Sequence, residues 1–382
     1  MRKIFLIFIF NLLFAEDVLI FQTPFDEVTS PPQTNTTIIA DEKNISIETN
    51  NTEQNLTKIT ISKIPTISKI PLPPKPQEET IILDEEFVSI KPSLTLAVII
   101  DKQKLFKFIP SILNSINAYF LNKDIEFSFK VFPKDTNLSE ISNNYSDILV
   151  YVTDKNYIKS LKEFNSTFYV PLYNKKDFSD INTTNIYFGG IDFQNQIEKL
   201  SFYIDDDKAV AINENTQISN TLFKYENELN LSITPFDYPY INYNELNNSF
   251  IFFNTTAGKT AQVLSNITAK NIDTKLQLTT QIDYNPLLIE ITQPEDIEKL
   301  LIANSITKVP VIIEDVNLLL DSDIKYNWLN YSTSVLLNKI YNQITSSDEF
   351  YMNDFNLYIF NNQINYKTKL YQIINGAFKP IE

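Results

Sequence analysis

Apolar runs and amphipathic segments alternate along the chain from Ser93 onward. Leu94–Ile100 is an unbroken apolar run rich in β-branched residues, which predicts a strand covered on both faces. From Leu105 to Phe120, apolar residues recur at steps of three and four, so they share one face of a helix. The pattern then repeats as strand, short helix and strand at Phe127–Phe132, Leu138–Asn144 and Asp147–Thr153. This order predicts a parallel α/β sheet with right-handed crossovers.

The alternation continues and then restarts at Lys208, which predicts a second sheet. The continuation has helices at Asn156–Phe164 and Phe193–Tyr203, and strands at Phe168–Leu172 and Asn185–Phe188. The second set has strands at Lys208–Ile212, Leu231–Ile233, Ser249–Phe253 and Lys275–Ile282, with helices at Gln217–Leu229 and Ala261–Ile272. We therefore expect an α/β fold of two lobes, each an open, mostly parallel sheet with flanking helices.

The first 92 residues have a different character. Met1–Lys3 is basic and precedes the apolar run Ile4–Ala15, whose length suits a secretory signal cleaved after Ala15 and is too short to span a bilayer. An uncleaved membrane anchor is the alternative. Residues 16–92 are dense in Thr, Asn, Ser, Lys, Glu and Pro, which predicts a disordered tether, with a proline-rich docking segment as the alternative. We expect an exported protein with no stable membrane span after the signal is removed.

Composition excludes several classes of function. The chain has no Cys and no His, which removes thiol nucleophiles, disulfides, Cys/His metal sites and the Ser-His-Asp triad. The formal net charge of −15 opposes binding to a nucleic-acid backbone. Only four glycines are present, too few for the glycine-rich loops that cradle nucleotides. We expect no cofactor, no metal and no nucleic-acid partner.

Acceptor motifs for N-glycosylation show an unusual bias toward an acidic residue two positions upstream. Thirteen Asn-x-Ser/Thr motifs occur, and eight of them carry Asp or Glu there, against about 1.6 expected if the 47 acidic residues of 382 were placed at random. This resembles the extended acidic acceptor sequence of the bacterial periplasmic oligosaccharyltransferase. The resemblance implies export to the periplasm and modification at Asn44, Asn50, Asn55, Asn137, Asn165, Asn182, Asn230 and Asn247.

The region from Ser93 to Glu382 also resembles the type I periplasmic binding proteins, the two-lobed family related to leucine-binding proteins, including its envelope accessory variants. The resemblance is carried by the strands LTLAVIID, SFIFFN and LQLTTQID, by the helix behind the first strand, and by a predicted terminal hairpin of Asn356–Phe360 with Leu370–Ile374. It implies a domain at 93–382 in which lobe 1 takes about 93–203 and 290–382 and lobe 2 takes about 204–289. It also implies a cleft between the lobes and a non-catalytic role.

Ligands of open α/β sheets bind beyond the carboxyl ends of the strands. The residues that follow apolar strands are therefore the candidate ligand-binding set: Asp101, Lys102, Gly189, Gly190, Thr255, Thr256 and Lys259. Asp101 as a helix cap, the glycines as turn residues and Lys259 as a solvated cation are the alternatives. The GKT at Gly258–Thr260 lacks the first glycine of a phosphate-binding loop, and the Asp205–Asp207 run lacks calcium-loop spacing.

Three classes of function remain after this sequence analysis. We expect a periplasmic module that binds a small-molecule ligand or an envelope protein. A scaffold within a secretion or motility machine is the alternative, favoured if the cleft is filled by the protein's own side chains. An enzyme that uses carboxylates alone, such as a glycoside hydrolase, is the third class.

Overall fold

The computed structural model describes residues 91–178, 181, 184–205, 208–229, 231–348 and 350–381. The predicted signal and nearly all of the predicted tether lie outside the described residues. So do five of the eight acidic acceptor sites: Asn44, Asn50, Asn55, Asn182 and Asn230.

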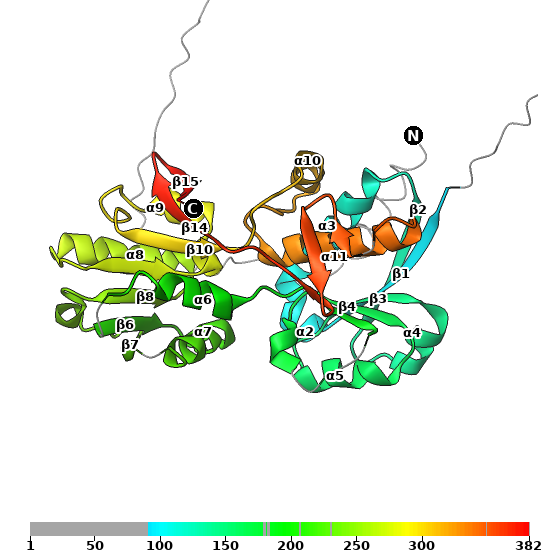
Figure 1. Cartoon of the computed structure of the whole chain (residues 1–382), viewed down its shortest axis with the longest axis horizontal. Helices are drawn as coiled ribbons and strands as arrows, with labels where there is room; N and C mark the ends of the chain where they lie inside the picture. The colour runs from blue at the N-terminus through cyan, green and yellow to red at the C-terminus, as the bar shows by residue number, and fades with distance from the viewer. Residues whose placement is uncertain are drawn as a thin grey trace, which may run out of the picture. The chain divides into compact units, whose positions relative to one another are not determined.

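An eight-stranded sheet forms the first lobe (Figure 1), in the order β11-β12-β13-β5-β4-β3-β1-β2. Its parallel part comprises β1 (Ser93–Ile100), β2 (Glu126–Pro133), β3 (Asp147–Tyr151), β4 (Thr167–Val170) and β5 (Ile186–Phe188). Three short strands from near the end of the chain extend it: β11 (Tyr351–Met352), β12 (Leu357–Phe360) and β13 (Gln363–Ile364). The apolar run in β1 is almost completely buried, as its composition predicts.

The helices of this lobe cover both faces of its sheet. They are α2 (Lys102–Leu105), α3 (Ile109–Leu121), α4 (Leu138–Asn144), α5 (Lys155–Ser160), α10 (Val311–Leu319) and α11 (Trp328–Ile344), with 3₁₀ turns η2 (Phe106–Phe108), η3 (Leu161–Glu163) and η4 (Lys175–Phe178). The single helix predicted over 105–120 is divided by η2, because Pro110 cannot donate a helical hydrogen bond and instead opens α3. The helix α11 packs against α3 and is buried along most of its length.

A seven-stranded sheet forms the second lobe, in the order β15-β14-β10-β9-β8-β6-β7. Its strands are β6 (Lys208–Asn213), β7 (Ser232–Asp237), β8 (Phe250–Asn254), β9 (Leu276–Thr279), β10 (Leu300–Asn304), β14 (Lys369–Ile374) and β15 (Ala377–Pro380). Its helices are α6 (Phe193–Ser201), α7 (Gln217–Asn227), α8 (Ala257–Ala269) and α9 (Pro286–Ile291), with η5 (Tyr243–Leu246) and η6 (Gln281–Asp283). Separate apolar clusters bury its two faces. The predicted fold class, two mostly parallel sheets with flanking helices, is therefore confirmed.

The division of the chain between the lobes differs from the prediction. Strands β10, β14 and β15 belong to the second sheet, although residues 290–382 were assigned to lobe 1. The predicted pairing of Asn356–Phe360 with Leu370–Ile374 is also wrong, because β12 pairs with β11 and β13 while β14 pairs with β10 and β15. Local turns decide these pairings. Asn361 and Asn362 take positive φ between β12 and β13, and Asn375 and Gly376 do so between β14 and β15.

Candidate functional site

Polar side chains gather at the carboxyl ends of β6, β8 and β9 in the second lobe, at the position predicted for a ligand site. Thr255 follows β8 and is fully buried, with its hydroxyl 2.7 Å from that of Thr260. Thr260 and Thr279 each donate a hydrogen bond of 2.8 Å to Oδ2 of Asp283. Thr255 is therefore part of an internal network and presents no free hydroxyl to a ligand.

Thr256 and Lys259 share one partner, the carboxylate of Glu214. Lys259 Nζ lies 2.8 Å from Glu214 Oε2 and also sits over the ring of Tyr238, while Thr256 Oγ1 contacts the same oxygen at 3.5 Å. The Glu214 side chain is only 3% exposed, whereas that of Lys259 is 42% exposed. The sequence analysis missed Glu214. It follows β6 directly, so the criterion that selected Asp101, a polar residue just after an apolar strand, could have found it.

Two fully buried carboxyl groups, those of Glu226 and Asp283, belong to the same end of the sheet. Asn254 donates 2.9 Å and 3.0 Å hydrogen bonds to Asn213 Oδ1 and Glu226 Oε2. Burial raises the pKa of Glu226 to about 8 and that of Asp283 to about 7. Oε1 of Glu226 and Oδ1 of Asp283 have no hydrogen-bond partner among the residues that the structure describes. Because both side chains are inaccessible to solvent, neither is placed to act on a substrate.

In the first lobe, the predicted residues serve the fold. Asp101 caps α2 by accepting a hydrogen bond from the Lys104 amide and forms a 3.0 Å ion pair with Lys134, whereas Lys102 is exposed. Gly189 and Gly190 are both buried in this lobe. At Gly190, an added Cβ would lie 2.2 Å from the backbone of Tyr173, so close backbone packing explains this glycine.

The carbonyl groups of the two glycines are also occupied. Gly189 O accepts a hydrogen bond from the Tyr366 hydroxyl, and Gly190 O accepts from Asn174 and Gln363. Within the described chain, the structure therefore joins only Thr256 and Lys259 of the predicted ligand set directly through a shared partner.

The three acidic acceptor sites in the described part of the chain are exposed but differ in their surroundings. At Asn137, the acidic residue Asp135 and the hydroxyl residue Ser139 are exposed as well, and Asn137 Oδ1 caps α4. At Asn165, the hydroxyl residue Thr167 already belongs to β4. At Asn247, the hydroxyl residue Ser249 is fully buried and donates to Glu245 O. Asn137 is thus the most accessible motif of the three.

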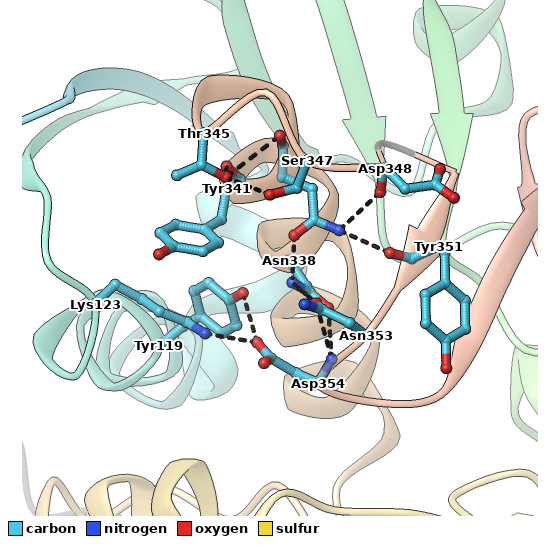
Figure 2. A network of polar contacts seen from close by, with 11 residues as sticks. Tyr119, Lys123, Asn338, Tyr341, Thr345, Ser347, Asp348, Tyr351, Asn353 and Asp354 are labelled. Carbon is cyan, nitrogen blue, oxygen red and sulfur yellow. Dashed lines mark hydrogen bonds and ion pairs between the residues drawn. The ribbon is translucent and has the colours of Figure 1, made fainter.

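A second polar cluster, which the sequence analysis did not find, fixes the end of α11 in the first lobe (Figure 2). Asp354 Oδ2 accepts hydrogen bonds from the Tyr119 hydroxyl at 3.0 Å and Lys123 Nζ at 2.7 Å. Asn338 bonds to Asn353 and to the Asp354 amide, and Asn342 donates to the carbonyl groups of Asp348 and Tyr351. Burial, aided by the Asp354 carboxylate, raises the pKa of Tyr119 well above its ordinary value, so its hydroxyl stays a donor.

Other potential sites give no further candidate. Two surface hollows in the described structure lie around Gln277 and Lys299 and around Lys199 and Phe202, away from the predicted ligand residues. Over the described ranges, no cluster of carboxylates has the geometry to hold a metal ion. None of the described helices combines the length and apolar character needed to cross a bilayer.

No family model and no curated protein matches the sequence. Solved structures do match. A branched-chain amino acid ABC transporter protein from Thermus thermophilus with bound valine is 12% identical over 76% of this chain and 95% of its own, with a TM-score of 0.54. Full-length LpoA from Haemophilus influenzae is 11% identical over 76% of this chain and 59% of its own, with a TM-score of 0.53.

The substrate-binding protein LivJ from Streptococcus pneumoniae, in complex with isoleucine, is 7% identical over 75% of this chain and 98% of its own, with a TM-score of 0.52. These similarities concern the fold alone, since the sequence identities are 12% or lower. The chain therefore has the two-lobed fold of the type I periplasmic binding proteins.

Proposed function

We propose that this chain is an exported, non-catalytic binding module of the bacterial envelope that acts through contacts with other proteins. The observation that carries the proposal is the pairing of Glu214 with Lys259 and Thr256. These are the groups at the strand ends that would otherwise be available to a ligand carboxylate. The buried carboxylate of the protein itself occupies them.

The energetic argument follows from burial. An amino-acid ligand that used Lys259 and Thr256 would have to displace Glu214, whose side chain is only 3% exposed. A buried carboxylate that loses its cation is strongly destabilised. The bound valine and isoleucine of the two similar transport proteins are therefore a poor guide to this chain.

Calorimetric titration of the purified protein with leucine and with valine tests this proposal. We expect no binding heat at ligand concentrations up to about 1 mM, which corresponds to about 4 kcal/mol of binding free energy. The variant Glu214→Gln provides the matched comparison, because it keeps the side-chain shape and removes the charge opposite Lys259. Micromolar binding of either amino acid by the unaltered protein would overturn the proposal.

Export and glycan attachment belong to the same proposal. The basic and apolar start of the chain and the acidic acceptor motifs support both, and Asn137 is the site in the folded part that we propose for modification. A glycan on Nδ2 would leave Oδ1 free to keep capping α4. Peptide mass analysis of protein from the periplasm of the native organism should find a glycan at Asn137 that Asn137→Asp abolishes. An unmodified Asn137 in every peptide would contradict this part.

A further inference from the structure

The helix α10 exposes an apolar face. Val311, Ile312, Leu318 and Leu319 are 70%, 66%, 62% and 83% exposed. Scattered exposed apolar residues are normal on protein surfaces, but here four large aliphatic side chains lie on one side of a helix of nine residues. We call these four residues the α10 face.

The spacing of the α10 face matches that of a helix that packs against another helix. Leu318 follows Val311 by seven residues and Leu319 follows Ile312 by seven, which is two helical turns. The other side of α10 carries its two buried residues, Ile313 and Asn317. Apolar residues repeated every seven positions form the seam between paired helices.

The α10 face is not needed to hold the helix in place. α10 packs against α3 in the first lobe (Figure 1). Asn317 Oδ1 accepts a 3.0 Å hydrogen bond from Ser115 Oγ, and Asn114 donates to the carbonyl of Leu320. These bonds and the burial of Ile313 hold the helix on the side that faces α3. The exposed apolar face is therefore preorganised for binding.

Charge defines the kind of partner. Asp315 is exposed and lies four residues after Val311 and three before Leu318, in the middle of the α10 face. Asp321, just past the helix, is also exposed. Neither carboxylate forms an ion pair with any described residue, whereas Glu314 on the flank pairs with Lys325. A partner at this face therefore gains from a positive charge opposite Asp315.

The same charges argue against two other occupants. In a symmetric pair of copies, the α10 face would bring one Asp315 against the other, and juxtaposed like charges are unfavourable. An anionic lipid surface would be repelled by these carboxylates and by a chain of formal charge −15.

We propose that the α10 face docks an amphipathic helical segment of another protein, with a Lys or Arg of that segment opposite Asp315. This inference rests on the proposed function, since it names where a protein partner binds and what chemistry that partner presents.

The test uses a fluorescent helical peptide of leucine and lysine at amphipathic spacing, titrated with the purified protein in an anisotropy assay. Two matched probes accompany it: the same composition in scrambled order, and the same pattern with glutamate in place of lysine. We expect the protein to bind the amphipathic leucine-lysine peptide and neither matched probe. This comparison separates specific docking from attraction between a cationic peptide and an acidic protein.

Variants locate the binding. The double variant Ile312→Ser/Leu319→Ser should weaken binding by about tenfold or more, because it removes two anchor side chains. Asp315→Asn should weaken it by about threefold, as expected for a single exposed charge pair. Phe202→Ser, which removes an equally exposed apolar side chain just after α6, should leave binding unchanged. All three changes lie on the surface, and circular dichroism would verify that the variants fold.

Three results would overturn the inference. One is equal binding of the peptide by the unaltered protein and the double variant. The second is a concentration-dependent dimer, measured by analytical ultracentrifugation, that the double variant abolishes, since this would assign the face to a second copy. The third is flotation with anionic lipid vesicles that depends on Ile312 and Leu319. The proposed function is tested separately by the calorimetric titration with leucine and valine. Failure of the peptide test would therefore contradict the docking site on α10 and not the proposed function.

Discussion

Two polar clusters, one partly buried in the first lobe and one fully buried in the second, compensate their carboxyl groups in opposite ways. In the first lobe, Asp354 is balanced by the Lys123 cation and the Tyr119 hydroxyl, and no buried side-chain atom of that described cluster lacks a partner. In the second lobe, Glu226 and Asp283 have no cation within hydrogen-bonding distance in the described structure, and each keeps one unpartnered oxygen. A buried carboxyl without a cation keeps its proton more readily.

The two clusters therefore differ in function. The first stabilises the fold through a fixed ion pair, whereas the charge of the second depends on pH. The Asp354 cluster holds α11 and β11 against α3 and resembles an ordinary structural ion pair (Figure 2). The cluster of Glu226, Asn254, Thr260 and Asp283, here called the strand-end cluster, lies at the carboxyl ends of the strands, the edge at which open α/β sheets bind ligands. Glu214 and Lys259 follow strands of the same sheet. The second cluster is thus the one whose contribution to stability should change with pH.

The largest expected effect is a loss of stability as pH rises from 5 to 8. The pKa values of Glu226 and Asp283, about 8 and about 7, exceed the ordinary values of 4.5 and 3.8, so the folded protein binds more protons in this interval than the unfolded chain does. The free energy of unfolding is therefore greatest below pH 4 for these groups and falls as the pH rises through 7 and 8, by roughly 6 kcal/mol between pH 5 and pH 8. Urea unfolding at each pH measures it.

The chain has no histidine, which makes this interval easy to interpret. The double variant Glu226→Gln/Asp283→Asn should remove the slope and exceed the stability of the unaltered protein at pH 8. Glu140→Gln, which changes an exposed carboxylate on α4, should keep the slope. Stability that rises between pH 5 and 8 would show that the two buried carboxyl groups are charged and paired after all.

The second effect concerns the Asp354 cluster. Asp354→Ala leaves the largely buried Lys123 cation and the Tyr119 hydroxyl without their acceptor, and should lower the free energy of unfolding by about 3 kcal/mol. Asp124→Ala, which breaks the exposed pair with Lys91, is the matched control and should cost less than about 0.5 kcal/mol. Urea unfolding measures both losses. Equal losses would mean that the Asp354–Lys123 pair stabilises the fold no more than the exposed Asp124–Lys91 pair does.

A third, smaller effect is expected at the pair of Glu214 and Lys259. Lys259→Ala leaves the Glu214 carboxylate buried with only a long contact to Thr256, and should cost about 1 to 2 kcal/mol. Adding Glu214→Gln should restore part of that loss, because the orphaned charge is removed. A double-mutant cycle measures the coupling, and purely additive losses would mean that the two residues do not interact in solution.

The smallest effect is expected for Thr256→Ala. Its hydroxyl is exposed and lies 3.5 Å from Glu214, at the limit of a hydrogen bond, so the change should stay within about 0.5 kcal/mol. Thr260→Val is the informative partner, because it removes a 2.8 Å hydrogen bond to the fully buried Asp283 and should cost about 1 to 2 kcal/mol. Thermal unfolding measures both losses. A larger loss of stability for Thr256→Ala than for Thr260→Val would contradict this prediction.

Sequence patterns predicted the parts of this fold that depend on neighbouring residues. The apolar run of β1 and the helix α4 lie where the pattern puts them, and Thr256 and Lys259 were found because they follow a strand. The partners of these residues could not be found in this way. Tyr119 and Asp354 are separated by 235 residues, and Thr256 and Glu214 by 42. Only the folded topology brings such residues together.

The two hairpin turns show a different limit. Asn375-Gly376 is a strong local signal for a two-residue hairpin, and it could have corrected the predicted pairing of β12 with β14. By contrast, no local feature of β10 tells which sheet it joins, because its five buried residues would suit the centre of either one.

The path of the chain between the two sheets affects how the protein assembles during synthesis. The chain leaves the first sheet after β5, returns to the first lobe after β10, and enters the second sheet again at β14. Neither sheet is complete until its last strands emerge, since β11 to β13 finish the first and β14 and β15 the second. As the chain is made from its amino end, both sheets keep open edges until residues 351–380 have emerged. A chaperone that shields strand edges is therefore most useful before these residues emerge.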